Sequence, residues 1–333
     1  MKKILNYVVL GIITVFVLYF SLKDNYEDII HTLSTMDMKW IIIAFIVMVI
    51  AWSLKTIPIY YFTKSHKKSF KYRNSIMLVL RTQFVNAITP FATGGQPYQI
   101  YYLNKKGIRS GTATGIILQN FIVYQIALVF LGIVALISNY IFHFFPYNSL
   151  LVYLITLGFI INTLVIVISF IVSFSKKLDK KLIKLGIAFL TKFHLVKDKE
   201  KTLSKWNDRI SKFHDSASIL VKNKKLFISM IFVNFLYLSL LYLIPMFVLF
   251  AMGDFGSVNV FTSIVSSAYV MLIGSLVPIP GGTGGLEYGY IKFYGNFISG
   301  GILSASMLIW RFITYYFGLI VGAIAFNIKE GEK

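Results

Sequence analysis

The apolar C-terminal part of the sequence is interrupted by the run Pro278-Ile-Pro-Gly-Gly-Thr-Gly-Gly-Leu-Glu287. Two prolines and four glycines within this run disfavour a continuous α-helix. Because lipid offers the backbone no hydrogen bonds, such a break is tolerated at membrane depth only inside protein or beside a cavity. Glu287 follows the glycines directly, and an ionisable residue at this depth is a candidate for function.

A looser copy of this run lies upstream, as Thr89-Pro-Phe-Ala-Thr-Gly-Gly-Gln-Pro-Tyr98. Both copies consist of proline, a few small residues, a Gly-Gly pair and then an aromatic-rich segment. Two apolar segments interrupted by glycine and proline at corresponding places indicate the binding site of a transporter. The sequence therefore predicts that both interrupted segments contribute to one site.

The composition places the chain among membrane proteins. Of its 333 residues, 57% are hydrophobic and 14% are charged, whereas a soluble domain carries about 25% charged residues. We expect an all-α polytopic membrane protein in which residues 1–333 form a single membrane domain. The sequence has no Cys, and its five His show no ligand spacing, so we expect no metal site and no cofactor.

The formal net charge of +20 would suggest a nucleic-acid partner in a soluble protein. Here the basic residues fall in loops between apolar spans, which the positive-inside bias and anionic lipid explain better, so no nucleic-acid partner is expected. The segment Lys176–Lys225 has fifteen Lys and Arg against five Asp and Glu. We expect it to bind anionic lipids of the inner leaflet, with a solvated cytoplasmic loop as the alternative. Lys55 and Lys292 also fall in apolar segments, where snorkelling toward the interface is the favoured interpretation.

The hydropathy pattern predicts six full transmembrane helices, at about residues 4–22, 40–62, 113–138, 150–174, 226–250 and 301–328. The first apolar run is too long for a signal peptide and no small-residue cleavage site follows it, so we expect a retained helix. The basic residues 175–225 separate a first half, 1–174, from a second half, 226–333.

The interrupted segments 75–103 and 258–297 are expected to form re-entrant helical hairpins. Both flanks of the first segment, 64–73 and 104–110, are basic, so both should be cytoplasmic. The second hairpin would enter from outside, which gives an inverted repeat with both termini on the cytoplasmic side of the plasma membrane. Eight full crossings are the alternative, but they would place the basic segment Lys176–Lys225 outside.

Glycine-rich turns at helix starts expose backbone N–H groups and the positive end of a helix dipole, which suits an anionic oxygen. We therefore expect the two turns to hold a phosphate, with tight helix packing or a hinge as the alternative. The turn residues assigned to this site are Pro90, Gly94, Gly95, Pro280, Gly281, Gly282, Gly284 and Gly285. Neither turn has the Lys-Ser/Thr ending of a nucleotide-binding loop.

Charged and amide side chains within the apolar segments complete the candidate substrate site. Arg81 and Arg311 lie too deep to snorkel, and a guanidinium holds phosphate bidentately, so we expect both to bind substrate. An ion pair with Glu287 is the structural alternative. Glu287 itself would hold a cationic headgroup, carry a proton or cap the helix that follows it. Gln96 and Gln99 add neutral polar groups, which in lipid often only bond neighbouring helices.

At these residues the sequence resembles the membrane domain of the lysylphosphatidylglycerol synthase/flippase family, which includes the multiple peptide resistance factor and shorter stand-alone relatives. The resemblance rests on Thr89-Pro-x-x-x-Gly94-Gly95-Gln-Pro97 and Pro278-x-Pro280-Gly-Gly-x-Gly-Gly-x-Glu287 and extends over nearly the whole chain. It implies a helical membrane domain that moves aminoacylated phosphatidylglycerol or another lipid-linked phosphate between leaflets. The chain departs from many relatives at Gln99, where they have Arg, and at Gln119-Asn120, where they have an acidic-Arg pair.

The expected function is that of a stand-alone lipid flippase without enzymatic activity. A lipid-modifying enzyme of the phosphatidylglycerol lysyltransferase type is the first alternative. The full-length synthases carry a soluble aminoacyl-transfer domain after the membrane part, whereas this sequence ends at Lys333, which argues against that alternative. The second alternative is a non-transporting scaffold that docks a cytoplasmic partner on Lys176–Lys225.

Overall fold

The computed structural model describes residues 26–145, 149–175 and 223–328, together with positions 202, 204, 207 and 210–216. Within these ranges the regular structure is entirely helical, which confirms the predicted all-α class. The predicted first crossing, residues 4–22, lies outside the described residues, as does most of the basic segment 175–225.

Five of the described helices are long and apolar enough to cross a membrane, and they correspond to five of the six predicted crossings. Each has at least 26 residues, which at about 1.5 Å per residue exceeds a hydrocarbon core of roughly 30 Å. They are α3 (Met38–His66), α6 (Ser110–Phe142), α7 (Ser149–Phe174), α10 (Lys224–Ala251) and the continuous run of α13 (Gly300–Arg311), η3 (Phe312–Tyr316) and α14 (Phe317–Asn327). The short helix α2 (Tyr26–Thr35) precedes α3 and contacts α13.

The first interrupted segment is a helical hairpin. It consists of α4 (Tyr72–Ala87), the single turn η1 (Pro90–Ala92) and α5 (Gly95–Lys105), and the two helices pack against each other. Its two ends adjoin, because the Lys67 ammonium donates a hydrogen bond of 2.6 Å to the carbonyl of Lys106. The chain therefore enters and leaves the first hairpin at the same end of the molecule, as the basic flanks predict.

The second interrupted segment repeats this arrangement with α11 (Val260–Gly274), the turn η2 (Pro280–Gly282) and α12 (Gly285–Tyr294). The hydroxyl of Tyr294, at the end of α12, lies 2.8 Å from the Ser267 hydroxyl and donates to the carbonyl of Ser263 at 3.1 Å. Both serines belong to α11, so the second hairpin also closes on itself.

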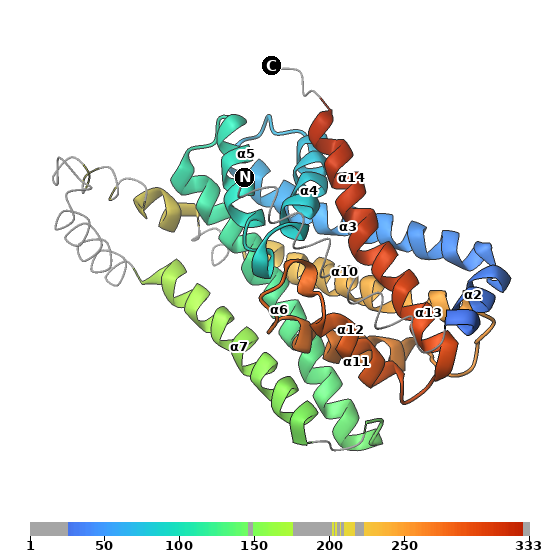
Figure 1. Ribbon diagram of the computed structural model, residues 1–333. Coiled ribbons are helices and arrows are strands. Elements are labelled where there is room, and N and C mark those ends of the chain that lie inside the picture. The colour runs from blue at the N-terminus through green and yellow to red at the C-terminus, as the bar shows by residue number, and fades with distance from the viewer. Residues whose placement is uncertain are drawn as a thin grey trace, which may run out of the picture.

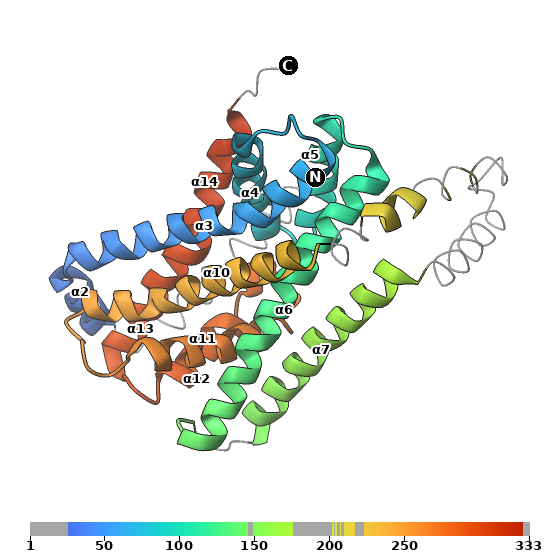
Figure 2. The ribbon, with the colours of Figure 1, turned by 180° about the vertical axis from the view of Figure 1, so that it is seen from behind.

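The two hairpins approach from opposite ends and meet at their turns. Figure 1 shows α4 and α5 in the upper part of the molecule and α11 and α12 in the lower part, and Figure 2 shows the same from behind. The turns η1 and η2 are in contact, and the Tyr315 hydroxyl donates to the carbonyl of Ala87 at 2.9 Å. This is the opposed arrangement expected of an inverted repeat.

The long helices pack around the two hairpins. Helix α10 packs along α3, α14 packs along α4, and α7 lies at the edge of the molecule against α6 and α11 (Figure 1). Large apolar side chains remain exposed on α7, including Ile160, Leu164 and Ile168. An exposed apolar face of this size suits contact with lipid tails.

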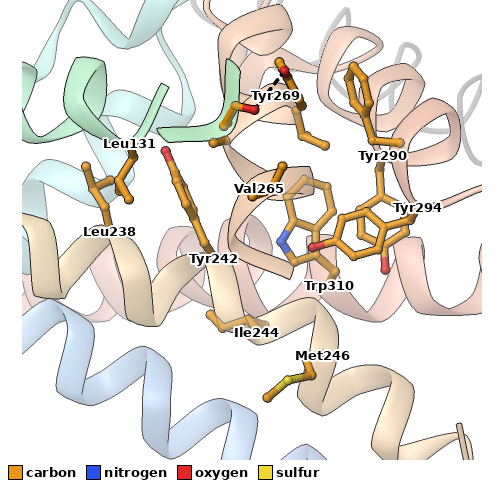
Figure 3. Close-up of a cluster of buried hydrophobic side chains, with 14 of the residues drawn as sticks. Leu131, Leu238, Tyr242, Ile244, Met246, Val265, Tyr269, Tyr290, Tyr294 and Trp310 are labelled. Atoms are coloured by element: carbon orange, nitrogen blue, oxygen red, sulfur yellow. Dashed lines mark hydrogen bonds between the residues drawn. The ribbon is translucent and has the colours of Figure 1, made fainter. Parts of the chain in front are cut away.

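The aromatic core fixes the base of the second hairpin (Figure 3). The Tyr290 ring stacks on those of Tyr294 and Trp310, with centroids 4.3 and 4.9 Å apart. The Tyr269 hydroxyl donates to the carbonyl of Ala135 on α6 at 3.0 Å, which satisfies a polar group inside this apolar cluster. A separate apolar cluster, with Phe62, Leu78 and Leu103 at its centre, surrounds the first hairpin.

Candidate functional site

The two hairpin turns share one backbone design. Each begins with a proline, Pro90 or Pro280, and continues with two residues in the left-handed region. These residues have φ values of 51° and 54° in the first turn and 69° and 63° in the second. A Thr-Gly-Gly sequence then leads into α5 at Gly95 and into α12 at Gly285. In both halves, the shared turn therefore places the N-terminus of a helix near the centre of the protein.

A buried ion pair lies behind the second turn. Arg311 Nε is 2.7 Å from Glu287 Oε1, and the two residues are 5% and 7% exposed. The second carboxylate oxygen accepts a hydrogen bond of 2.7 Å from the N–H of Gly284, so Glu287 also caps α12. Arg311 Nη2 donates to the carbonyl of Gly281 at 3.1 Å, which ties α13 to the turn.

The sequence left open whether Glu287 and Arg311 pair or bind substrate, and in this structure they pair. The capping role considered for Glu287 is also present. The π-helical turn η3 follows Arg311 directly, and the Arg311 guanidinium lies over the Tyr315 ring at 4.8 Å. Such π-turns are often found at functional sites. Substrate binding by this pair and by the glycines of the turn remains a prediction.

Arg81 lies apart from the ion pair. Its Nε and Nη2 donate to the carbonyls of Ala325 and Ile328, at 2.9 and 2.8 Å. These carbonyls end α14, so Arg81 caps that helix and complements the negative end of its dipole. Arg81 does not line the cavity between the first hairpin and helices α3, α6 and α10, and its phosphate contact remains a prediction.

A cavity of about 550 Å³ lies between the first hairpin and helices α3, α6 and α10. Several residues that the sequence singled out meet there, among them Gly95, Gln96 and Gln99 from the hairpin and Asn120 from α6. The remaining residues of its walls are Lys55, Thr82, Asn86, Phe91, Ala92, Thr93, Pro97, Ile117, Phe121, Tyr124 and Asn234. Amides and hydroxyls from four separate segments thus share a single space.

Lys55 brings a cation to this cavity, rather than snorkelling as the sequence suggested. Its ammonium lies 5.5 Å from the centroid of the Tyr237 ring. Asn234 and Asn86 were missed by sequence reasoning. An asparagine in the middle of the apolar helix α10 is the signal that would have pointed to Asn234.

Two glutamines of α6 bond neighbouring segments, which was the structural alternative for such residues. Gln119 donates to the backbone carbonyl of Ser216, whose hydroxyl lies 2.9 Å from His66 Nε2. Gln125 donates to Asn162 Oδ1 on α7 at 2.6 Å. Gln119 therefore serves packing, whereas its neighbour Asn120 faces the cavity.

No group of three or more His, Asp or Glu side chains comes together within the described ranges, so no metal centre is formed there.

Five long apolar helices around two opposed, interrupted hairpins define an all-α polytopic membrane protein. The family model described as the lysylphosphatidylglycerol synthase TM region matches residues 6–322, and the chain belongs to this family. It is also similar to a protein of Archaeoglobus fulgidus described as a UPF0104 membrane protein. The two are 24% identical over 297 residues, which cover 86% of this chain and 85% of the relative.

Proposed function

We propose that the protein is a flippase that moves a lipid with a phosphate headgroup between the two leaflets. The observation that carries this proposal is the meeting of two opposed hairpin turns beside a polar cavity. A phosphate crossing roughly 30 Å of hydrocarbon needs a polar path, while the lipid tails can remain outside among other tails. Membership in the lysylphosphatidylglycerol synthase family supports a lipid as the substrate.

In the proposed cycle, the hairpins part alternately. Movement of the first hairpin opens the cavity to one leaflet, and movement of the second opens the Glu287–Arg311 region to the other. The Arg311 guanidinium would exchange the Glu287 carboxylate for the phosphate as the headgroup passes, because a guanidinium binds both groups with the same geometry. We further propose a plasma-membrane location with both termini in the cytoplasm, which the basic loops support.

The proposal is tested with purified protein in vesicles that carry fluorescent phosphatidylglycerol in both leaflets. A membrane-impermeant reductant bleaches only the outer leaflet of protein-free vesicles, and we expect it to bleach both leaflets when the protein is present. The double variant Glu287→Gln/Arg311→Gln should behave like empty vesicles. The control Lys292→Gln removes an exposed charge from α12 and should translocate normally. Wild-type vesicles that match protein-free ones would refute the proposal.

The enzyme alternative has its own measurement. Radiolabelled lysine and charged tRNA are supplied to membranes that contain the protein, and incorporation of label into lipid is followed. We expect no incorporation above that of membranes without the protein. If incorporation of label into lipid depends on this protein, its function is lysyl transfer and the transport proposal is refuted.

A further inference from the structure

We infer that the cavity under the first hairpin binds the phosphate of an anionic lipid headgroup through Lys55, and that it disfavours headgroups carrying a positive charge. This deepens the proposed function and depends on it for the view that the bound lipid is the one transported. The binding itself follows from the walls of the cavity.

The charge of Lys55 has no acidic partner on the described walls of the cavity. Among the described residues that line it, Lys55 is the only Lys or Arg, and none is Asp or Glu. Within the described part of the chain, its ammonium lies over the Tyr237 ring, 5.5 Å from the ring centroid. A charged side chain within a transmembrane helix is expensive unless it faces a partner or a wet cavity. An anionic ligand supplies the partner that the described residues do not.

The start of α5 also borders the cavity. This helix begins at Gly95, on the cavity wall, and its N-cap Gly94 provides no side-chain cap. The first turn of a helix has N–H groups without partners inside the helix and carries the positive end of the dipole. In the second hairpin the carboxylate of Glu287 fills this role. Pro97 stands at the corresponding position of the first turn and brings no charge. The N–H of Gly94 donates to the Thr89 hydroxyl at 3.1 Å, so within the described residues the N–H groups of Gly95 and Gln96 are the ones left to a ligand.

Uncharged polar side chains add hydrogen-bonding groups to the cavity. Gln96 and Asn120 line the cavity, and in the part of the chain described here their side chains form no hydrogen bond. Both amides can donate to phosphate oxygens. Asn86 also lines the cavity, and its buried Oδ1 has no donor within the described residues. A phosphodiester oxygen would accept a hydrogen bond from either Gln96 or Asn120.

The residues of the cavity walls also indicate which lipid headgroups bind weakly. An aminoacylated headgroup adds an ammonium, and the described residues of the cavity walls offer it no carboxylate. The carboxylate of the second turn, Glu287, is not on these walls and is already bonded to Arg311 and Gly284. A cavity of about 550 Å³ accommodates a headgroup, while the tails stay in lipid.

The experiment measures binding to the purified full chain in nanodiscs of phosphatidylcholine. Short-chain phosphatidylglycerol, lysylphosphatidylglycerol, glycerol phosphate and inorganic phosphate are each titrated and followed calorimetrically. We expect phosphatidylglycerol to bind at least tenfold more tightly than the lysylated lipid and than either soluble phosphate. Equal or tighter binding of the lysylated lipid would overturn the charge selection. Equal binding of inorganic phosphate would overturn the assignment to a lipid.

Amino-acid substitutions test the roles of Lys55 and Asn120 in lipid binding. Lys55→Gln should weaken phosphatidylglycerol binding at least tenfold, Lys55→Arg should retain it, and the exposed control Lys292→Gln should leave it unchanged. Asn120→Asp adds a carboxylate to the same walls and should reverse the preference toward the lysylated lipid. Unchanged binding in both Lys55→Gln and Asn120→Asp would refute the site. Binding that depends on Lys55 in a protein that does not translocate lipid would keep the site and refute the flippase.

Discussion

The carboxylate of Glu287 bonds two different elements at once: Arg311 Nε at 2.7 Å and the N–H of Gly284 at 2.7 Å. One side chain thereby connects the helix that follows the second hairpin to the turn that forms its tip. Because both charged residues are buried, the pair is stable only while each member has its partner.

Removing one member of this pair should destabilise the protein. Glu287→Gln and Arg311→Gln each leave a buried charge unpaired, which typically costs about 3–5 kcal/mol. The double variant should recover most of the lost stability but should not translocate lipid, because the second hairpin then offers the headgroup no charged group. Thermal unfolding in detergent and the vesicle assay test both expectations. A double variant with wild-type translocation would leave the pair a purely structural role.

Gly281 should be intolerant of any side chain. Its φ is +69°, and a Cβ added there would lie 2.2 Å from Cε2 of the Tyr315 ring. Gly281→Ala should therefore lose on the order of 2–3 kcal/mol, from the left-handed backbone and from overpacking together. Gly253→Ala is the matched control, because Gly253 has a φ of +80° and no atom within 4 Å of the added Cβ. If the two variants unfold at the same temperature, the contact with Tyr315 is unimportant.

The two flanks of the first hairpin should be accessible from the same side of the membrane. The hydrogen bond between Lys67 and Lys106 places them together. Since the sequence has no Cys, single cysteines at Ser69 and Ser110 can be labelled without background. An impermeant thiol reagent should reach both positions in inside-out vesicles and neither in intact cells. Labelling of the two positions from opposite sides would rule out the hairpin.

The basic segment Lys176–Lys225 should bind anionic membranes through charge. Each Lys or Arg near such a surface contributes about 1 kcal/mol, and the segment has fifteen. A peptide of this sequence should bind vesicles containing phosphatidylglycerol and dissociate as salt is added. Binding that is insensitive to salt would contradict the electrostatic interpretation, as would equal binding to phosphatidylcholine.

Much of the fold follows from local sequence, because run length and turn chemistry are local properties. The ends of α3, α6, α7 and α10 lie within a few residues of the predicted ones, since the apolar runs determine them. The hairpins were predictable from glycine and proline within apolar segments with basic flanks. The turn η3 was not, because Phe312–Tyr316 is an ordinary apolar sequence whose π-helical geometry depends on packing.

The site was harder to predict because its contacts join distant parts of the chain. Arg81 was expected to bind phosphate, yet its partners are carbonyls 244 and 247 residues away. No property of the sequence near Arg81 indicates that α14 ends beside it. Lys55 was likewise interpreted from its own helix, whereas the cavity that it faces exists only once α3, α6, α10 and the first hairpin assemble.

The two turns have the same shape but different residues in the left-handed positions. The second turn uses glycines there, whereas the first uses Phe91 and Ala92. A residue with a side chain in that region raises the conformational energy by on the order of 1–3 kcal/mol, so the backbone of the first turn is strained and that of the second is not. A rearrangement that lets Phe91 and Ala92 leave this conformation releases that strain. We therefore expect the two hairpins to move at different rates, because only the first turn stores backbone strain that its movement can release.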